Sequence, residues 1–441
     1  MAFSKTLAEM EQSVPESEAR KRLESFFDDG EFTELDKFLS AEGEVSSVVT
    51  GFGTVDGTSV YVFAQDSSVK GGAVNKSAAL KIAKIYDLAA KSGAPVVGFY
   101  DSKGGDINEG MAVLSAYGDI IKASAAVSGV VPQIAVITGV CAGCAAMLAE
   151  MADVTVMSKD AELFLTSPFN TPDGKLEGAG KAAGAAKSGV ADIVAKSADE
   201  AVETAKKLVS ALPENNMAVG GNRIYDENDA VITAALKGEK LVEALADKGS
   251  VIELGASFGT AAYTALASVK CGTVAFVATD KAAKLSADDA AKIARFVQLA
   301  DVFSIPVITV LDTEGFEGSS AAELAGSVRE CAKLAQVYAA ATTLKINLIT
   351  GNAFGAAYAA FDAADIAYAW EGAKIAPMNP EAGKVFMGEE IVVNPFAAAA
   401  EGMVDGVIAP EDTREAVSSA MWMCSDKRVS APARKRPNIA F

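Results

Sequence analysis

Two stretches of the chain share one pattern, Ile137-Thr-Gly-Val-Cys-Ala-Gly143 and Ile349-Thr-Gly-Asn-Ala-Phe-Gly355. Their first residues lie 212 positions apart, and the same spacing carries Ala152-Asp-Val154 onto Ala364-Asp-Ile366. A register that holds over separate blocks is the mark of an internal repeat. We therefore infer that the 441-residue chain arose by duplication of one unit.

The predicted elements follow the same order in both copies. Helical patterns alternate with short apolar runs rich in β-branched residues, which is typical of parallel strands covered by helices. The predicted elements are helices at 77–92 and 288–303, strands ending at Asp101 and Asp312, helices at 110–128 and 320–341, and strands at 133–138 and 345–350. We predict an α/β protein with two tandem domains, 1–215 and 216–441, because a chain of this length exceeds one ordinary core.

The composition excludes several classes of function. The chain has 39 Lys and Arg against 58 Asp and Glu, a formal charge of −19, so general binding to nucleic acid or to an anionic membrane is not expected. Its five cysteines are scattered, which argues against a disulfide framework. The most apolar run, 134–149, is too short to span a bilayer, and the N-terminus does not resemble a secretory signal. We expect a soluble cytoplasmic protein.

The chain contains no histidine. Its absence excludes Ser-His-Asp and Cys-His catalysis, imidazole metal ligation and acid–base chemistry by histidine. Any catalysis must come from carboxylates, Lys, Tyr, thiols or the backbone.

The strongest local signals are the two strand–turn–helix junctions, 138–144 and 350–357. Backbone N–H groups at a helix start carry partial positive charge, and small residues let a ligand approach them closely. Such a pair of donors can form an oxyanion hole for a thioester carbonyl. Gly and Ala also serve the tight packing of a helix on a sheet. Each turn taken alone favours packing, and the repetition makes the functional interpretation competitive.

Cys141 and Cys144 form a C-x-x-C pattern within the first junction. A zinc site would need two more soft ligands, and a redox pair would need an exposed thiol of lowered pKa. We interpret both thiols as small buried hydrophobes.

Acidic loops follow the first strand of each copy. We predict that Asp101 and Asp312 cap the helices that come next. Gly104, Gly105 and Gly315 are predicted to let these loops approach a ligand, because α/β proteins bind ligands outside the carboxyl ends of parallel strands.

Several ordered blocks from about Arg20 onward carry a family resemblance. They include Val49-Thr-Gly-Phe-Gly-Thr-Val-Asp-Gly57, Ser188-Gly-Val-Ala191, Leu212-Pro-Glu-Asn-Asn216, Asp312-Thr-Glu-Gly-Phe316 and Ala353-Phe-Gly-Ala-Ala-Tyr358. With these blocks the chain resembles the carboxyltransferase family, which comprises the β subunits of propionyl- and acetyl-CoA carboxylases and the related subunits of biotin-dependent acyl-CoA decarboxylases.

The resemblance implies two tandem crotonase-like (ClpP/crotonase) ββα-spiral domains. The N-terminal copy would bind acyl-CoA, and the C-terminal copy of a neighbouring subunit would bind carboxybiotin on a separate carrier protein. Carboxyl transfer would join N1 of carboxybiotin and the α-carbon of an acyl thioester through an enolate, in a homo-hexamer. The implied partners are a biotin carboxyl carrier protein and a biotin carboxylase subunit, or the membrane subunits of a decarboxylase.

The resemblance also implies roles for individual residues. Gly143 and Cys144 would donate N–H groups to the thioester oxygen. Ala356 and Ala357 would donate to the biotin ureido oxygen, and the Phe316 carbonyl would accept from biotin N1. The remaining residues that would line the substrate are Gly104, Gly105, Gly315, Tyr358 and Ala359, the last at a position associated in the family with acyl-chain choice.

The chain departs from the family pattern at several positions, and it is shorter than usual after Thr166 and around 217–250. Cys144 and Ala356 replace glycines, and Asp106 replaces an arginine. The substrate is therefore left open between propionyl/methylmalonyl-CoA and acetyl/malonyl-CoA, and the reaction could instead be decarboxylation of methylmalonyl- or glutaconyl-CoA. Two further hypotheses are a hydratase or hydrolase that uses Glu109 and Glu150, and a non-catalytic scaffold subunit.

Overall fold

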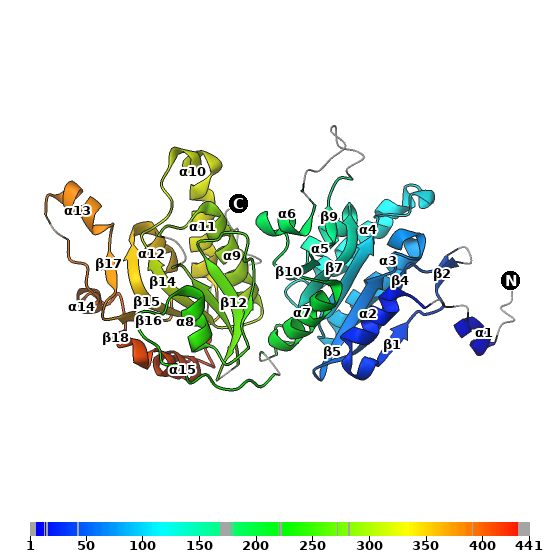
Figure 1. The fold of residues 1–441 in the computed structure, drawn as a ribbon, viewed down its shortest axis with the longest axis horizontal. Coiled ribbons are helices and arrows are strands. Elements are labelled where there is room, and N and C mark those ends of the chain that lie inside the picture. The colour runs from blue at the N-terminus through cyan, green and yellow to red at the C-terminus, as the bar shows by residue number, and fades with distance from the viewer. Residues whose placement is uncertain are drawn as a thin grey trace. The chain divides into compact units, whose positions relative to one another are not determined.

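The computed structural model describes residues 6–12, 14, 16–41, 44–167, 178, 180–218, 220, 223–270, 272–280, 283–389 and 391–430. The chain divides into two compact units, Met1–Ala218 and Val219–Phe441, each holding one copy of the repeat (Figure 1).

Within the described residues, each unit is built on one eight-stranded sheet. In order across the first sheet lie β1 (Phe32–Leu35), β4 (Val48–Val55), β5 (Thr58–Gln65), β6 (Val96–Ser102), β7 (Gln133–Ala142), β8 (Val154–Ser158) and β10 (Ile193–Ala195), and β9 (Glu162–Phe164) pairs with β7 off this path. A small ribbon joins β2 (Ser40–Ala41) and β3 (Glu44–Val45).

The second sheet repeats this topology strand for strand. Its order is β11 (Ile252–Glu253), β12 (Tyr263–Val269), β13 (Gly272–Ala278), β14 (Val307–Thr313), β15 (Lys345–Phe354), β16 (Ile366–Trp370) and β18 (Gly406–Ile408), and β17 (Lys374–Ala376) pairs with β15. In both sheets the first three strands pair antiparallel and all later pairings are parallel.

Helices cover the sheets. Those of the first unit are α1 (Leu7–Gln12), α2 (Glu18–Phe26), α3 (Lys76–Ser92), α4 (Ala112–Val127), α5 (Cys144–Glu150), α6 (Ala182–Lys187) and α7 (Ala198–Ala211). Those of the second are α8 (Gly238–Leu245), α9 (Ala287–Val302), α10 (Ser320–Ala325), α11 (Ser327–Ala340), α12 (Gly355–Phe361), α13 (Pro380–Met387), α14 (Pro395–Ala400) and α15 (Thr413–Met423).

Strand β6 shows why its sequence is apolar throughout. Successive residues of a strand point to opposite faces of the sheet. Phe99 packs edge-on against Phe26 of α2, with ring centroids 5.3 Å apart. Its neighbour Tyr100 packs edge-on against Phe63 of β5 at 5.5 Å. Both faces are therefore buried, as the near-continuous apolar runs of parallel sheets predict.

The predicted helices and strands are found in both units, with two differences. The helix expected over 320–341 is two helices, because Gly326 adopts a left-handed φ of +90° that ends α10 before α11 begins. The strands expected to end at residues 138 and 350 continue as β7 to Ala142 and as β15 to Phe354.

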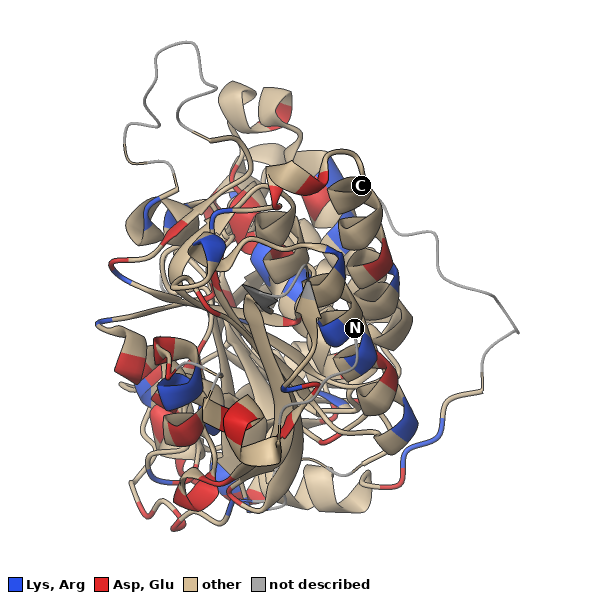
Figure 2. Ribbon diagram, turned by 90° about the vertical axis from the view of Figure 1, so that its right-hand side faces the viewer, with Lys and Arg blue, Asp and Glu red and all other residues tan. Residues whose placement is uncertain are grey.

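Charged residues lie mostly on the helices and loops, where both signs occur side by side, and the strands carry few of them (Figure 2). No helix among the described residues combines the length and the apolar character needed to cross a membrane.

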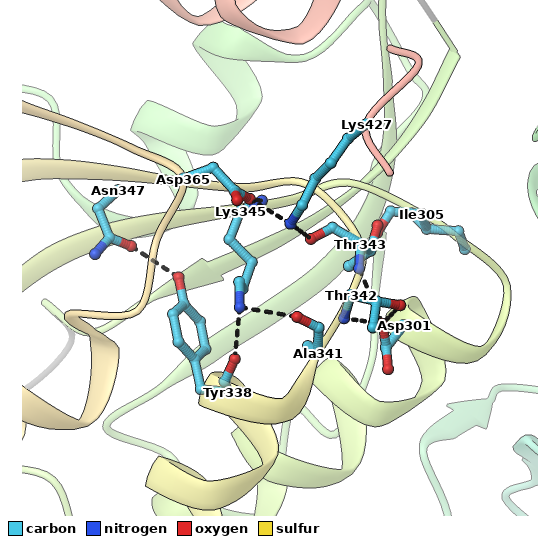
Figure 3. Close-up of polar contacts among 10 residues, drawn as sticks. All are labelled: Asp301, Ile305, Tyr338, Ala341, Thr342, Thr343, Lys345, Asn347, Asp365 and Lys427. Carbon is cyan, nitrogen blue, oxygen red and sulfur yellow. Dashed lines mark hydrogen bonds and ion pairs between the residues drawn. The ribbon is translucent and has the colours of Figure 1, made fainter. Parts of the chain in front are cut away.

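Lys345 is a buried cation at the start of β15 (Figure 3). Its Nζ donates hydrogen bonds to the carbonyl oxygens of Tyr338 and Ala341, at 2.8 and 2.9 Å, and so satisfies acceptors at the C-terminal end of α11. The Lys345 backbone N–H donates to Asp365, which also accepts from Lys427. A cation at a helix C-terminus is favoured by the helix dipole.

In the first unit a neutral side chain makes the equivalent hydrogen bond to the end of a helix. Gln133 is the repeat equivalent of Lys345, and its amide donates to the carbonyl oxygen of Ser124 near the end of α4. Each sheet therefore ties the start of its central strand to the end of the preceding long helix.

We predict that Lys345→Met lowers the free energy of unfolding by about 2 kcal/mol, because two buried carbonyls lose their donor. Lys345→Gln is expected to lose less, since glutamine can donate as Gln133 does. Chemical denaturation of the two variants beside wild type measures both effects. Equal stability of Lys345→Met and wild type would contradict the assignment.

Candidate active site

Strands β7 and β15, called here the central strands of their sheets, each contain a bulge just before the turn that follows. Along β6 and β7, Tyr100 pairs with Ile137, and the next pairing joins Ser102 to Cys141. Three residues of β7, 138–140, thus stand opposite the single residue Asp101. Strands β14 and β15 repeat the irregularity: Leu311 pairs with Ile349 and then Thr313 with Ala353. Bulges of this kind redirect a strand and often lie beside functional sites.

The carboxylates of Asp101 and Asp312 each accept a hydrogen bond from a residue of the bulge. Oδ1 of Asp101 accepts a hydrogen bond from the Val140 N–H at 3.3 Å, and Oδ1 of Asp312 accepts from the Asn352 N–H at 2.8 Å. The prediction that these residues cap the next helices is therefore wrong. Each carboxylate instead bonds to the neighbouring strand, which lies about 40 residues further along the chain.

Glycine is required inside each bulge by this close approach. A Cβ on Gly139 would lie 2.1 Å from Asp101 Oδ1, and a Cβ on Gly351 would lie 2.3 Å from Asp312. Such distances are far below van der Waals contact, so any larger residue would displace the carboxylate.

The first turn leaves two adjacent backbone donors at the start of α5. Gly143 adopts a φ of +63°, and its N–H donates to the Phe164 carbonyl oxygen at 2.9 Å. The N–H groups of Cys144 and Ala145 have no acceptor among the described residues. The Gly143 N–H, which the resemblance assigned to the thioester oxygen, is therefore already paired within the chain, and the adjacent N–H groups without an acceptor belong to Cys144 and Ala145.

The second turn has the same form. Gly355 adopts a φ of +58°, and α12 begins there. Ala356 and Ala357, the repeat equivalents of Cys144 and Ala145, belong to the first turn of the helix, whose N–H groups have no intrahelical partner. The 212-residue register was the signal that could have identified Ala145, because it maps Ala357 onto that position.

The glycine loops beside the turns are also duplicated. The Gly104 carbonyl oxygen accepts from Val74, and the Gly315 carbonyl oxygen accepts from Leu285. The N–H groups of both glycines donate to nearby hydroxyls, Ser102 and Thr313. With φ values of +111° and +129°, these two glycines shape the loops and do not present free donors.

The other predicted site residues differ in what their side chains meet. A Cβ on Gly105 would lie 2.5 Å from Val113, so this position needs glycine for packing. No described group donates to the Phe316 carbonyl oxygen. Tyr358 donates its hydroxyl to the Met403 carbonyl oxygen at 3.2 Å. Ala359 is exposed on α12.

The two thiols of the first junction differ in burial. Cys141 is fully buried, and burial raises the pKa of its thiol, which makes it a poor nucleophile. Cys144 is partly exposed at the helix start. The burial of Cys141 agrees with its interpretation as a small hydrophobe.

The carboxylates proposed for a hydratase do not converge on the turn. Glu109 accepts a hydrogen bond from the Lys76 N–H at the start of α3. Glu150 is the last residue of α5, about 9 Å along the helix axis from Cys144. This arrangement does not favour a carboxylate pair at the α- and β-carbons of a thioester.

A cavity of about 530 Å³ lies beside α6 and β9. It is lined by Leu163, Gly180, Lys187 and other residues of α6 and the loop after it. Leu163 precedes Phe164, whose carbonyl oxygen accepts from Gly143. The volume falls within the usual range of small-molecule sites, and the described lining residues are mostly small and apolar, with the cation Lys187 among them.

Comparison with known proteins identifies the family. The model of the carboxyl transferase domain matches residues 15–387. The chain belongs to the carboxyl transferase domain family. The propionyl-CoA carboxylase beta chain of Roseobacter denitrificans is 34% identical, over 96% of this chain and 93% of that protein. The methylmalonyl-CoA decarboxylase subunit alpha of Propionigenium modestum is also 34% identical, over 96% and 92%.

Solved structures support the same conclusion. A transcarboxylase 12S structure, described as a hexamer assembly with hydrolysed methylmalonyl-coenzyme A bound, superposes with a TM-score of 0.91 at 32% identity. The superposition covers 99% of this chain and 94% of that one. The match confirms the predicted fold of two crotonase-like units, and the enzyme class is a carboxyltransferase.

We predict that Cys144→Pro abolishes most carboxyl transfer and that Cys144→Ala does not. Proline is tolerated at the first position of a helix, so this change removes one N–H with little strain. Loss of an oxyanion donor lowers kcat by about 100- to 1,000-fold. Steady-state kinetics of both variants, with thermal unfolding as the check on folding, tests this. Wild-type kcat in a folded Cys144→Pro variant would remove Cys144 from the donor pair.

Proposed function

We propose that this carboxyltransferase moves a carboxyl group between carboxybiotin on a partner carrier protein and the α-carbon of a short acyl-CoA. The observation that carries the proposal is the duplicated helix start, with an adjacent pair of backbone N–H groups in each unit. Propionyl/methylmalonyl-CoA is the favoured substrate pair, because relatives with these names match over nearly the whole chain. Acetyl/malonyl-CoA is the other short pair.

In the first unit, the N–H groups of Cys144 and Ala145 would bind the thioester oxygen of the acyl-CoA. Negative charge collects on that oxygen when the α-carbon becomes nucleophilic. Fixed N–H dipoles that point at this position stabilise the enolate more than the ground state, which lowers the barrier. Gly143 would contribute by its left-handed conformation, which starts α5 at the required place. This chemistry needs no histidine.

In the second unit, the backbone pattern fits the ureido group of biotin. Ala356 and Ala357 present N–H groups for a ureido oxygen, and the Phe316 carbonyl oxygen accepts from no described residue. A donor pair and an acceptor are together complementary to a group that carries both C=O and N–H. When bound, biotin supplies the carboxyl group and a base for the α-proton.

The partners follow from this chemistry. We propose that biotin arrives on a separate carrier protein and that a biotin carboxylase subunit charges it. We further propose that the chain works in the cytoplasm as a hexamer, so that the acyl-CoA unit (1–215) of one subunit can face the biotin unit (216–441) of another. The hexamer described for transcarboxylase 12S supports this arrangement.

Decarboxylation is the second candidate. The decarboxylase subunit from Propionigenium modestum is as similar as the propionyl-CoA carboxylase chain. The same two donor pairs would serve transfer in either direction, because the enolate lies on both paths. In that case the partners would be the membrane subunits of a decarboxylase.

The test is decarboxylation of malonyl-CoA and methylmalonyl-CoA by the full chain with free biotin. We expect biotin-dependent loss of the carboxyl group, faster with methylmalonyl-CoA. Faster turnover of malonyl-CoA would overturn the substrate assignment. If acyl-CoA binds but neither ester turns over with or without biotin, the chain is a scaffold subunit and the proposed function is wrong.

A further inference from the structure

We propose that Asp101 and Asp312 are positioning residues, each of which aims the donor pair of its own unit. The inference rests on the proposed function of the two turns. Neither carboxylate has to touch a substrate, because each acts through the hydrogen bond to the bulge that precedes its turn.

We call the hydrogen bond between Val140 and Asp101, or between Asn352 and Asp312, a clamp. In the first unit only a short piece of chain separates the clamp from the donor pair, Cys144 and Ala145. Val140, whose N–H bonds to Asp101, is four residues before Cys144. In between, β7 pairs with β9 from Val140 to Ala142. A shift of the bulge must therefore displace this pairing and the start of α5. Displacements near 1 Å in a donor cost about 100-fold in rate.

The clamps are oriented in the same way in both units. The backbone N–H of Asp101 donates to Gln65 Oε1 at 3.2 Å, and that of Asp312 donates to Thr279 Oγ1 at 3.0 Å. Gln65 and Thr279 are equivalent, because each follows a residue of β5 or β13 that pairs with the residue two positions before the aspartate. Different side chains thus accept the same backbone N–H in the two units. Both copies therefore retain the position of the aspartate.

The second carboxylate oxygen distinguishes the two clamps. Asp101 Oδ2 accepts from the Ser67 hydroxyl at 2.6 Å, whereas Asp312 Oδ2 accepts from the Lys237 ammonium at 2.6 Å. The hydrogen bond to Asp312 raises the pKa of Lys237, so this side chain stays charged. A hydroxyl can donate or accept, but an ammonium can only donate.

This difference predicts opposite outcomes for the isosteric change to asparagine. In Asp101→Asn, the amide oxygen can accept from Val140 while the amide nitrogen donates to Ser67. In Asp312→Asn, the amide nitrogen would face the Lys237 ammonium, and two donors would oppose each other. Replacing Lys237 by glutamine supplies an acceptor and should restore the clamp.

The chain offers matched controls at the other end of the same strands. Asp153 accepts the N–H of Gln133 at the start of β7, and Asp365 accepts that of Lys345 at the start of β15, both at 2.8 Å. Asp153→Ala and Asp365→Ala each remove a carboxylate–backbone bond from the same central strand, far from the turn. They report the structural cost of losing such a bond, and Asp365→Ala also removes the ion pair with Lys427.

The experiment measures kcat and KM for methylmalonyl-CoA decarboxylation with free biotin. We expect kcat to fall about 100-fold in Asp101→Ala and Asp312→Ala, with KM for the CoA ester changed less than about threefold. Asp101→Asn should recover most of the loss. Asp312→Asn should not, and the Asp312→Asn/Lys237→Gln pair should. Asp153→Ala and Asp365→Ala should lose thermal stability with kcat near wild type.

Two results would overturn the proposal. One is a kcat in Asp101→Ala and Asp312→Ala no lower than in the controls at equal stability. The other is an Asp312→Asn loss that Lys237→Gln leaves unchanged.

Hydrogen exchange separates this inference from the proposed function. The Val140 and Asn352 amides should lose protection in Asp101→Ala and Asp312→Ala respectively, and keep it in the controls. If wild type turns over neither ester, the function fails while the exchange data still decide whether the clamps hold the bulges. Unchanged protection of both amides would refute the clamps themselves.

Discussion

In each unit the central strand leaves its hydrogen-bonded register for three residues and returns to it two residues out of step. A carboxylate on the neighbouring strand, Asp101 or Asp312, accepts the backbone N–H that this irregularity would otherwise leave unpaired. Both N–H groups are partly buried, and an unpaired donor inside a sheet is costly, so the carboxylate stabilises the bulge. The close approach of the carboxylate requires the glycine inside the bulge, and a glycine of positive φ and a short helix follow within a few residues.

Duplication explains why one chain carries two such sites, and the differences between the copies indicate separate tasks. The topology, the bulge and the glycine loops are the same in both units. What varies is the charge around them: Lys345 replaces Gln133, and Lys237 replaces Ser67 beside the carboxylate. The second unit therefore holds its central strand with cations where the first uses neutral groups, which suits a site that receives a different ligand.

The sequence predicted the duplication, the α/β class and the positions of both turns, because these depend on local pattern and on a register of fixed length. It did not predict the bulges. The apolar run from Ile134 to Ala149 contains most of β7, its bulge and the start of α5, and its continuous apolar pattern does not mark where one ends and the next begins. The hydrogen bonds of Asp101 and Gly143 were also missed, since their partners Val140 and Phe164 are set by tertiary pairing.

The central claim is that each unit binds one half of the reaction at its own pair of backbone donors. A crystal structure with a non-hydrolysable methylmalonyl-CoA analogue and biotin tests it most directly. We predict that the thioester oxygen lies within hydrogen-bond distance of the Cys144 and Ala145 nitrogens, and the ureido oxygen within that distance of the Ala356 and Ala357 nitrogens. Both ligands at one turn, exchanged turns, or ligands bound away from either pair would contradict it.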